Sequence, residues 1–182
     1  MRAQEGPPTP RGMDALAARA TLHTDMTFDE SMLRAASQIM PDEDKPIIAK
    51  LRSITVHQFR YSAAGMYDPA ALEAVRAQYR EGGWNHLVTK QTHPPAQTVS
   101  STTADASGAP ISAAPVKPFD PTWTDVWVRM DHANFDGMVV LVANERNVNL
   151  IVIDGMISPL DLLHLRGHFG IPKFGGDLEG RQ

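Results

Sequence analysis

The chain has 182 residues, of which 42% are hydrophobic, and it carries a formal net charge of −4 at pH 7. A chain of this length can bury one hydrophobic core, so a single domain is expected. The weakly acidic balance provides no basic surface for phosphates, which argues against nucleic acid as a partner. The absence of cysteine excludes disulfides and thiol chemistry, and no apolar run approaches the roughly 18 residues that a membrane span needs.

The N-terminal third of the sequence predicts one disordered segment and three helices. Residues 1–12 are rich in Pro and Gly and are expected to be disordered, and 13–20 favours a short helix. Thr27 and Glu30 match a capping box, which predicts a helix with apolar residues at helical spacing after it. Pro46 then predicts the start of a further short helix whose apolar stripe contains Ile47, Ile48 and Leu51.

Two segments in the middle of the chain have the composition of strands. The first, ITVHQFRY at 54–61, is rich in β-branched and aromatic residues, and the second is WNHLVTK at 84–90. His57 lies inside the first strand, where a histidine usually packs within the sheet. We interpret it as a structural residue.

A similar pattern occurs twice, in GMYDPAALEAVRAQY at 65–79 and GMISPLDLLHLRGHF at 155–169. Asp68 in the first copy and Ser158 in the second are suitable N-caps. Each is followed by Pro at the first helical position and then by apolar residues on one helical face. Neither copy contains a glycine-rich phosphate-binding motif. The pattern therefore predicts two capped helices that each follow a strand, and it leaves both chance recurrence and an internal duplication open.

The C-terminal half begins with a segment, 92–121, that is rich in Pro, Ser, Thr and Ala and is expected to be a flexible insertion. TWTDVWVRM, MVVLVA and VNLIVID then predict three antiparallel strands, with a tight turn at Asn144 and Glu145. Together these elements predict a single α+β domain at 13–174. We expect a mainly antiparallel sheet of about five strands, helices mostly on one face that include both capped helices, and a flexible tail at 175–182.

The strand TWTDVWVRM places four residues of interest on one face, because side chains alternate along a strand. These residues are Trp123, Asp125, Trp127 and Arg129. If a helix covers this face, they belong to the core. If it is open, aromatic residues and an arginine are the types that anchor protein interfaces, so the face is a candidate partner surface.

Catalytic and metal-binding motifs are weak throughout the sequence. His164 and His168 stand four positions apart and would share one face of a helix, so with a third ligand they could hold zinc. However, the Glu of a His-Glu-x-x-His motif is absent, and no third ligand follows. HANFDG at 132–137 resembles the start of a calcium-binding loop, but Ala143 stands where such a loop needs Glu. We therefore expect no cofactor, no resident metal and no catalytic residue.

The order of these elements, and the strand NVNLIVID running into Gly155 and the Ser158-Pro159-x-x-Leu162 pattern, resembles the domain-of-unknown-function family 4252. This family consists of small exported or lipid-anchored bacterial proteins. The resemblance implies an α+β domain in the periplasm or cell envelope, and it brings no catalytic residues. MRAQEGPPTPRG contains no signal peptide, so an envelope location would require that a signal peptide had been removed.

The expected function is therefore a non-catalytic envelope or regulatory module that binds a protein partner. A small metal-dependent hydrolase that uses His164 and His168 is the alternative.

Overall fold

The structure, a computed structural model, describes residues 10–92, 122–165, 168 and 169. Most of the expected disordered N-terminal segment, nearly all of the expected insertion at 92–121 and the expected C-terminal tail lie outside the described residues. The predicted end of the domain at residue 174 lies outside them as well.

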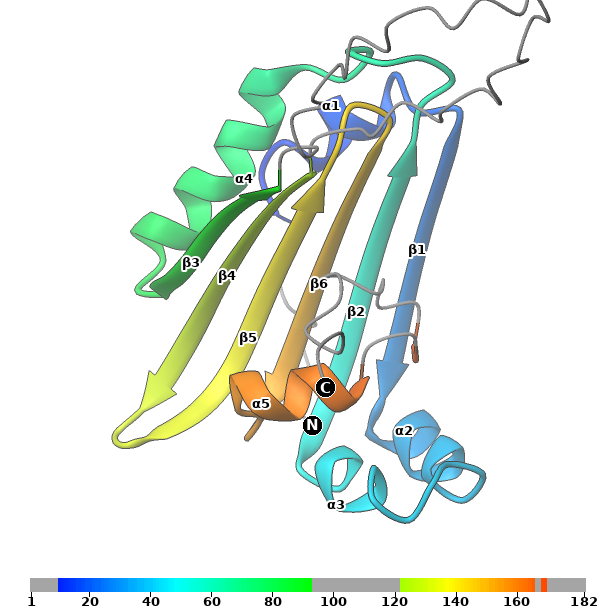
Figure 1. The fold of residues 1–182 in the computed structure, drawn as a ribbon, viewed down its shortest axis with the longest axis vertical. Coiled ribbons are helices and arrows are strands. Elements are labelled where there is room, and N and C mark those ends of the chain that lie inside the picture. The colour runs from blue at the N-terminus through cyan, green and yellow to red at the C-terminus, as the bar shows by residue number, and fades with distance from the viewer. Residues whose placement is uncertain (1–9, 93–121, 166–167, 170–182) are drawn as a thin grey trace, which may run out of the picture.

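A single antiparallel sheet of six strands forms the centre of the structure, in the order β1-β2-β6-β5-β4-β3 (Figure 1). The strands are β1 (Leu22–Asp29), β2 (Leu51–Arg60), β3 (Asn85–Thr92), β4 (Thr122–Asp131), β5 (Asn134–Ala143) and β6 (Asn147–Gly155). The helices are α1 (Met13–Ala17), α2 (Glu30–Ser37), α3 (Lys45–Ile48), α4 (Pro69–Glu81) and α5 (Pro159–Leu165). The predicted α+β class is confirmed, with six strands rather than about five.

Both faces of the sheet are buried in its centre, and β5 shows this most clearly. Because successive side chains of a strand point to opposite faces, Met138 and Val140 join one hydrophobic cluster while Val139 and Leu141 join the other. All four are at most 1% exposed. The continuous apolar run MVVLVA therefore reflects a strand that is covered on both sides.

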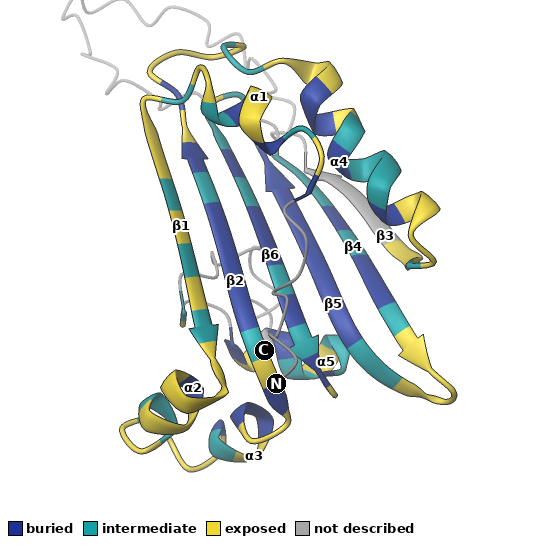
Figure 2. Ribbon diagram, turned by 180° about the vertical axis from the view of Figure 1, so that it is seen from behind, coloured by how far each residue is buried: buried dark blue, intermediate teal, exposed yellow. Residues whose placement is uncertain are grey.

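Helices are divided between the two faces. Helices α1 and α4 lie over the face seen in Figure 2, whereas α5 lies over the face seen in Figure 1. The buried residues agree with this arrangement, since Val75 of α4 and Leu165 of α5 belong to different clusters. The expectation that both capped helices share a face is therefore wrong. Helix α4, which follows β2, and helix α5, which follows β6, pack on opposite faces of the sheet.

The predicted caps of these two helices are confirmed. The Asp68 carboxylate accepts a hydrogen bond from the Ala70 amide at 2.8 Å, and Pro69 occupies the first turn of α4. At α5 the bonds are reciprocal, because the Asp161 amide donates to the Ser158 hydroxyl and the Ser158 amide donates to the Asp161 carboxylate. Each cap satisfies amides that the first helical turn leaves without a partner.

The capping box predicted at Thr27 and Glu30 is wrong. Strand β1 continues through Thr27 as far as Asp29, and α2 begins only at Glu30. Asp29 is the N-cap, since its carboxylate accepts a hydrogen bond from the Met32 amide at 2.9 Å. Asp29, two residues after Thr27, is also a suitable N-cap. Because Thr27 is paired with β2 as part of β1, the helix begins after Asp29 and Asp29 is the cap.

None of the helices among the described residues combines the length and the apolar character that crossing a membrane would require.

Candidate functional site

The face of β4 that was a candidate partner surface is largely covered by α4. Trp127 is 1% exposed and Asp125 is 3% exposed. Trp127 stacks on Tyr79 of α4 with ring centroids 5.5 Å apart, and Arg76 of the same helix donates a hydrogen bond to Asp125 at 2.8 Å. These two residues therefore belong to the packed core, which was the other reading of this strand.

Trp123 and Arg129, the other two members of that face, are partly exposed at the two ends of β4. Arg129 lies over the ring of Trp84, with its guanidinium carbon 5.2 Å from the ring centroid. Because α4 buries the residues between them, Trp123 and Arg129 do not form one continuous surface with Trp127.

His164 and His168 are both exposed, but they do not share a helical face. Helix α5 ends at Leu165, so His164 lies in its last turn and His168 lies beyond it. The His168 amide donates to the Leu165 carbonyl in a tighter turn. Neither histidine belongs to a group of three possible metal ligands among the residues that the structure describes.

A different set of titratable side chains comes together on β1 and β2. His23 and Asp25 are two positions apart on β1, and Asp25 lies directly opposite His57 of β2. His23 Nε2 lies 2.8 Å and His57 Nδ1 lies 2.6 Å from the same oxygen, Oδ1 of Asp25. We call these three residues the His-Asp-His cluster. It contains one possible ligand atom from each residue, and all of these atoms lie within 4.8 Å of one another.

Packing holds the rings of the His-Asp-His cluster in place. The ring of His23 stacks on Phe59 with centroids 4.5 Å apart and an angle of 13° between the planes. His57 is almost enclosed, with 11% of its side chain exposed, whereas Asp25 is about half exposed. Partial burial raises the pKa of Asp25, but hydrogen bonds and charge from His57 and His23 outweigh it and leave that pKa below its ordinary value.

Four further charged residues form a closed network at the end of the sheet where β2 begins. They come from four strands, and two of these strands have a register shift, which leaves Arg52 unpaired on β2 and Asp136 unpaired on β5. Such bulges re-aim side chains, and here Arg52 and Arg129 both donate to Asp136 and Asp154 at 2.7–2.9 Å. The hydrogen bonds from Arg52 lower the pKa of Asp154 despite its partial burial.

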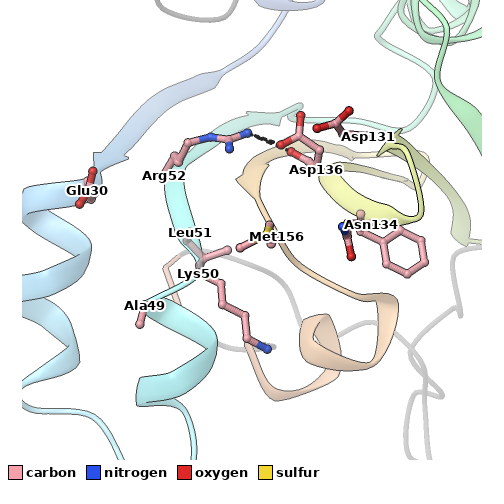
Figure 3. Close-up of a pocket in the computed structure, with 10 residues that line it drawn as sticks. Glu30, Ala49, Lys50, Leu51, Arg52, Asp131, Asn134, Asp136 and Met156 are labelled. Carbon is pink, nitrogen blue, oxygen red and sulfur yellow. Dashed lines mark hydrogen bonds and ion pairs between the residues drawn. The ribbon is translucent and has the colours of Figure 1, made fainter.

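A groove of about 360 Å³ lies beside this network (Figure 3). Its lining includes Lys50 just before β2, Arg52 near the start of β2, Asp136 from β5 and Met156 after β6. The Arg52–Asp136 ion pair crosses one side. Lys50 in turn lies 3.9 Å from Asp161 of α5. Because these charges already compensate one another, we interpret the network as structural and assign no ligand to the groove.

Strand β1 also presents an open edge. It pairs with β2 through eight consecutive residues without a register shift, and it is one of the two edge strands of the sheet, the other being β3 (Figure 1). No partner strand lies on its outer side among the described residues. Charged side chains, especially lysine, together with proline and bulges commonly protect such edges from further pairing. Strand β1 contains no lysine or proline, and its charged residues are Asp25 and Asp29.

Comparison of the chain with models of known families, with curated proteins and with solved structures found no match in any of the three. The fold and the site therefore define the class of protein: an α+β domain with one six-stranded antiparallel sheet and an open edge strand that carries titratable side chains. The resemblance to the domain-of-unknown-function family 4252 stays a prediction.

The sequence alone did not indicate the His-Asp-His cluster. His57 was expected to be a packed residue, and its burial confirms this, but no role was predicted for His23 or Asp25. The available signal was the His-x-Asp spacing in a segment of extended character, which places both side chains on one face of a strand. What brings His57 to them is the pairing of β1 with β2, and that register depends on residues 32 positions apart.

Proposed function

We propose that this chain is a non-catalytic module that binds a protein partner, and that the partner adds an extended segment to the open edge of β1. The observation that carries this proposal is the regular eight-residue edge strand. Addition of a strand to a sheet edge is a common mode of peptide recognition, in which main-chain hydrogen bonds supply affinity and side-chain contacts supply specificity.

Hydrogen bonding identifies the amides that would receive the partner. The Tyr61 amide donates to the Arg146 carbonyl across β2 and β6, and bonding directions alternate along an antiparallel strand. Odd-numbered residues of β2 thus bond toward β6 and even-numbered residues bond toward β1. Even-numbered residues of β1 lie opposite even-numbered residues of β2 and therefore bond to them. The amides of the odd-numbered residues His23, Asp25 and Thr27 consequently point to the open edge.

Side chains along β1 would contribute specificity. Leu22 is 53% exposed, and Met26 and Phe28 are only partly covered by the hydrophobic cluster on their face. A partner strand with apolar residues at alternate positions would cover these side chains on one face. The bacterial envelope, which the family resemblance implies, is part of this proposal, and it rests on that resemblance alone.

Two proline variants test the role of the edge. In Thr27→Pro the lost amide points outward, so we expect a fold of near wild-type stability and loss of partner binding, because the proline ring blocks an added strand. In Met26→Pro the lost amide points toward β2, where Met26 pairs with buried Val56, so we expect this variant to be less stable than Thr27→Pro by about 1–3 kcal/mol. Denaturant unfolding and capture of partners from bacterial envelope extract measure the two effects.

The control for Thr27→Pro is Thr27→Val, which removes the same hydroxyl but keeps the amide. The Thr27 hydroxyl bonds that of Thr55 at 3.2 Å, so both variants lose this contact equally. A partner that is retained by Thr27→Val and lost by Thr27→Pro supports binding through the edge. A partner that a folded Thr27→Pro protein retains at wild-type strength contradicts it.

A further inference from the structure

The His-Asp-His cluster has the chemistry of a metal site. Two imidazole nitrogens and one carboxylate oxygen converge from adjacent strands, one ligand atom each from His23, Asp25 and His57, all within 4.8 Å of one another. Imidazole suits zinc, copper, iron and nickel, and a set of three protein ligands that leaves a position open is typical of sites where water or substrate completes the coordination. The sheet thus assembles two histidines and one carboxylate on one face.

The distances are compatible with zinc after small side-chain rotations. Zinc bonds nitrogen and oxygen at about 2.0–2.2 Å, so two ligand atoms in a tetrahedral site lie about 3.3–3.6 Å apart. The two histidine contacts to Asp25, at 2.6 and 2.8 Å, would therefore lengthen by less than about 1 Å when an ion replaces the hydrogen bonds. The ligand atoms of the three residues all lie within 4.8 Å of one another, and His23, whose side chain is 35% exposed, can shift within its stack on Phe59 to adjust these separations.

The surroundings fix the ligands and leave access from solvent. Phe59 orients the ring of His23 by stacking, and burial within β2 orients His57. Asp25, about half exposed, faces the solvent side of the cluster. A bound ion would therefore have protein on one side and an accessible coordination position on the other.

We propose that His23, Asp25 and His57 form a binding site for a divalent transition metal ion of the zinc class, with at least one coordination position open to solvent. This site differs from the edge-binding role proposed above, because it uses side chains on one face of the sheet while the edge uses outward amides. Either can hold without the other.

Equilibrium dialysis of the untagged full chain against Zn²⁺, followed by metal analysis, tests the site. After removal of metal with a chelator, the wild-type protein should take up one equivalent of Zn²⁺. Loss of a residue that only hydrogen-bonds to a metal ligand typically weakens metal affinity by roughly 10–100-fold. His57→Gln and His23→Gln each remove a ligand itself, so each should weaken Zn²⁺ affinity by more than this. Binding should also raise the melting temperature of the wild-type protein, because the ion binds only the folded state.

His132→Gln and His164→Gln are matched controls, since both histidines are exposed and lie outside the cluster. They should bind Zn²⁺ as the wild type does. Asp25→Asn guards against an effect of unfolding, because it keeps the size of the side chain and should weaken uptake while circular dichroism stays unchanged. The proposal is overturned if the wild type takes up no stoichiometric Zn²⁺, or if folded His23→Gln and Asp25→Asn proteins bind it as tightly as wild type.

Discussion

Gly155→Ala is expected to destabilise the protein by about 2–6 kcal/mol, because the added methyl group combines backbone strain with overlap of neighbouring atoms. Gly155 ends β6 with φ of 140°, a backbone conformation that side chains rarely adopt. A β-carbon at this position would lie 2.5 Å from the carbonyl oxygen of Lys50 and 2.7 Å from the α-carbon of Leu51. Both obstacles are backbone atoms that lead into β2, so neither can move aside without displacing that strand.

Gly65→Ala is the matched control in denaturant melts. Gly65 precedes α4 in the first copy of the repeated pattern, as Gly155 precedes α5 in the second, and it also has positive φ, of 71°. Apart from Gly65 itself and its two chain neighbours, no residue places an atom within 4 Å of an added β-carbon there. Its replacement should therefore cost only about 1 kcal/mol, from backbone strain alone. Equal costs for the two variants would contradict the close approach of β6 and β2 at Gly155.

Leu165→Ala should cost about 2–5 kcal/mol, because it removes a fully buried side chain from the cluster beneath α5. Leu162, at 3% exposure, should behave in the same way. Both residues are central to the claim that α5 seals the face of the sheet opposite α4. Urea or guanidinium unfolding curves measure the loss directly.

Leu160→Ala provides the control, because Leu160 lies on the same helix but is 72% exposed. It should change the free energy of unfolding by no more than about 0.5 kcal/mol. A small effect at Leu165 together with a large effect at Leu160 would show that α5 presents the opposite face to the sheet.

Local signals in the sequence were sufficient for most of the elements. Asp68 with Pro69 and Ser158 with Pro159 determine where α4 and α5 begin, since each combination satisfies the first amides of a helix. Alternating or continuous apolar residues likewise indicated β2, β4, β5 and β6. These signals act within a few residues, so they can be read without knowledge of the fold.

Spatial relations between elements could not be read in this way. Both capped helices follow strands with similar patterns, yet Val75 and Leu165 pack on opposite faces of the sheet. The rotation that superimposes one strand of an antiparallel pair, such as β2 and β6, on the other does not turn the sheet over. Two strand–helix units related by this rotation would therefore place both helices on the same face of the sheet. The observed arrangement therefore favours a recurring helix-start motif over an internal duplication as the origin of the repeated pattern.

The candidate site depended on register for the same reason. A shift of β1 by one residue against β2 would turn its side chains to the other face and separate His23 and Asp25 from His57. For Trp127, the strand spacing correctly placed the side chain on the same face as Asp125. Whether α4 covers that face depends on tertiary packing, which the local pattern does not show. Burial under α4 removes Trp127 from any partner surface.

Amide hydrogen exchange along β1, followed by nuclear magnetic resonance on the dilute monomer, tests the central claim of an open edge most directly. The proposed geometry predicts alternation: the amides of Thr24, Met26 and Phe28 should be protected by bonds to β2, whereas those of His23, Asp25 and Thr27 should exchange rapidly. Addition of a partner should then protect the second set. Protection of the His23, Asp25 and Thr27 amides in the free monomer would contradict the proposed open edge, because it would mean that the edge is already occupied.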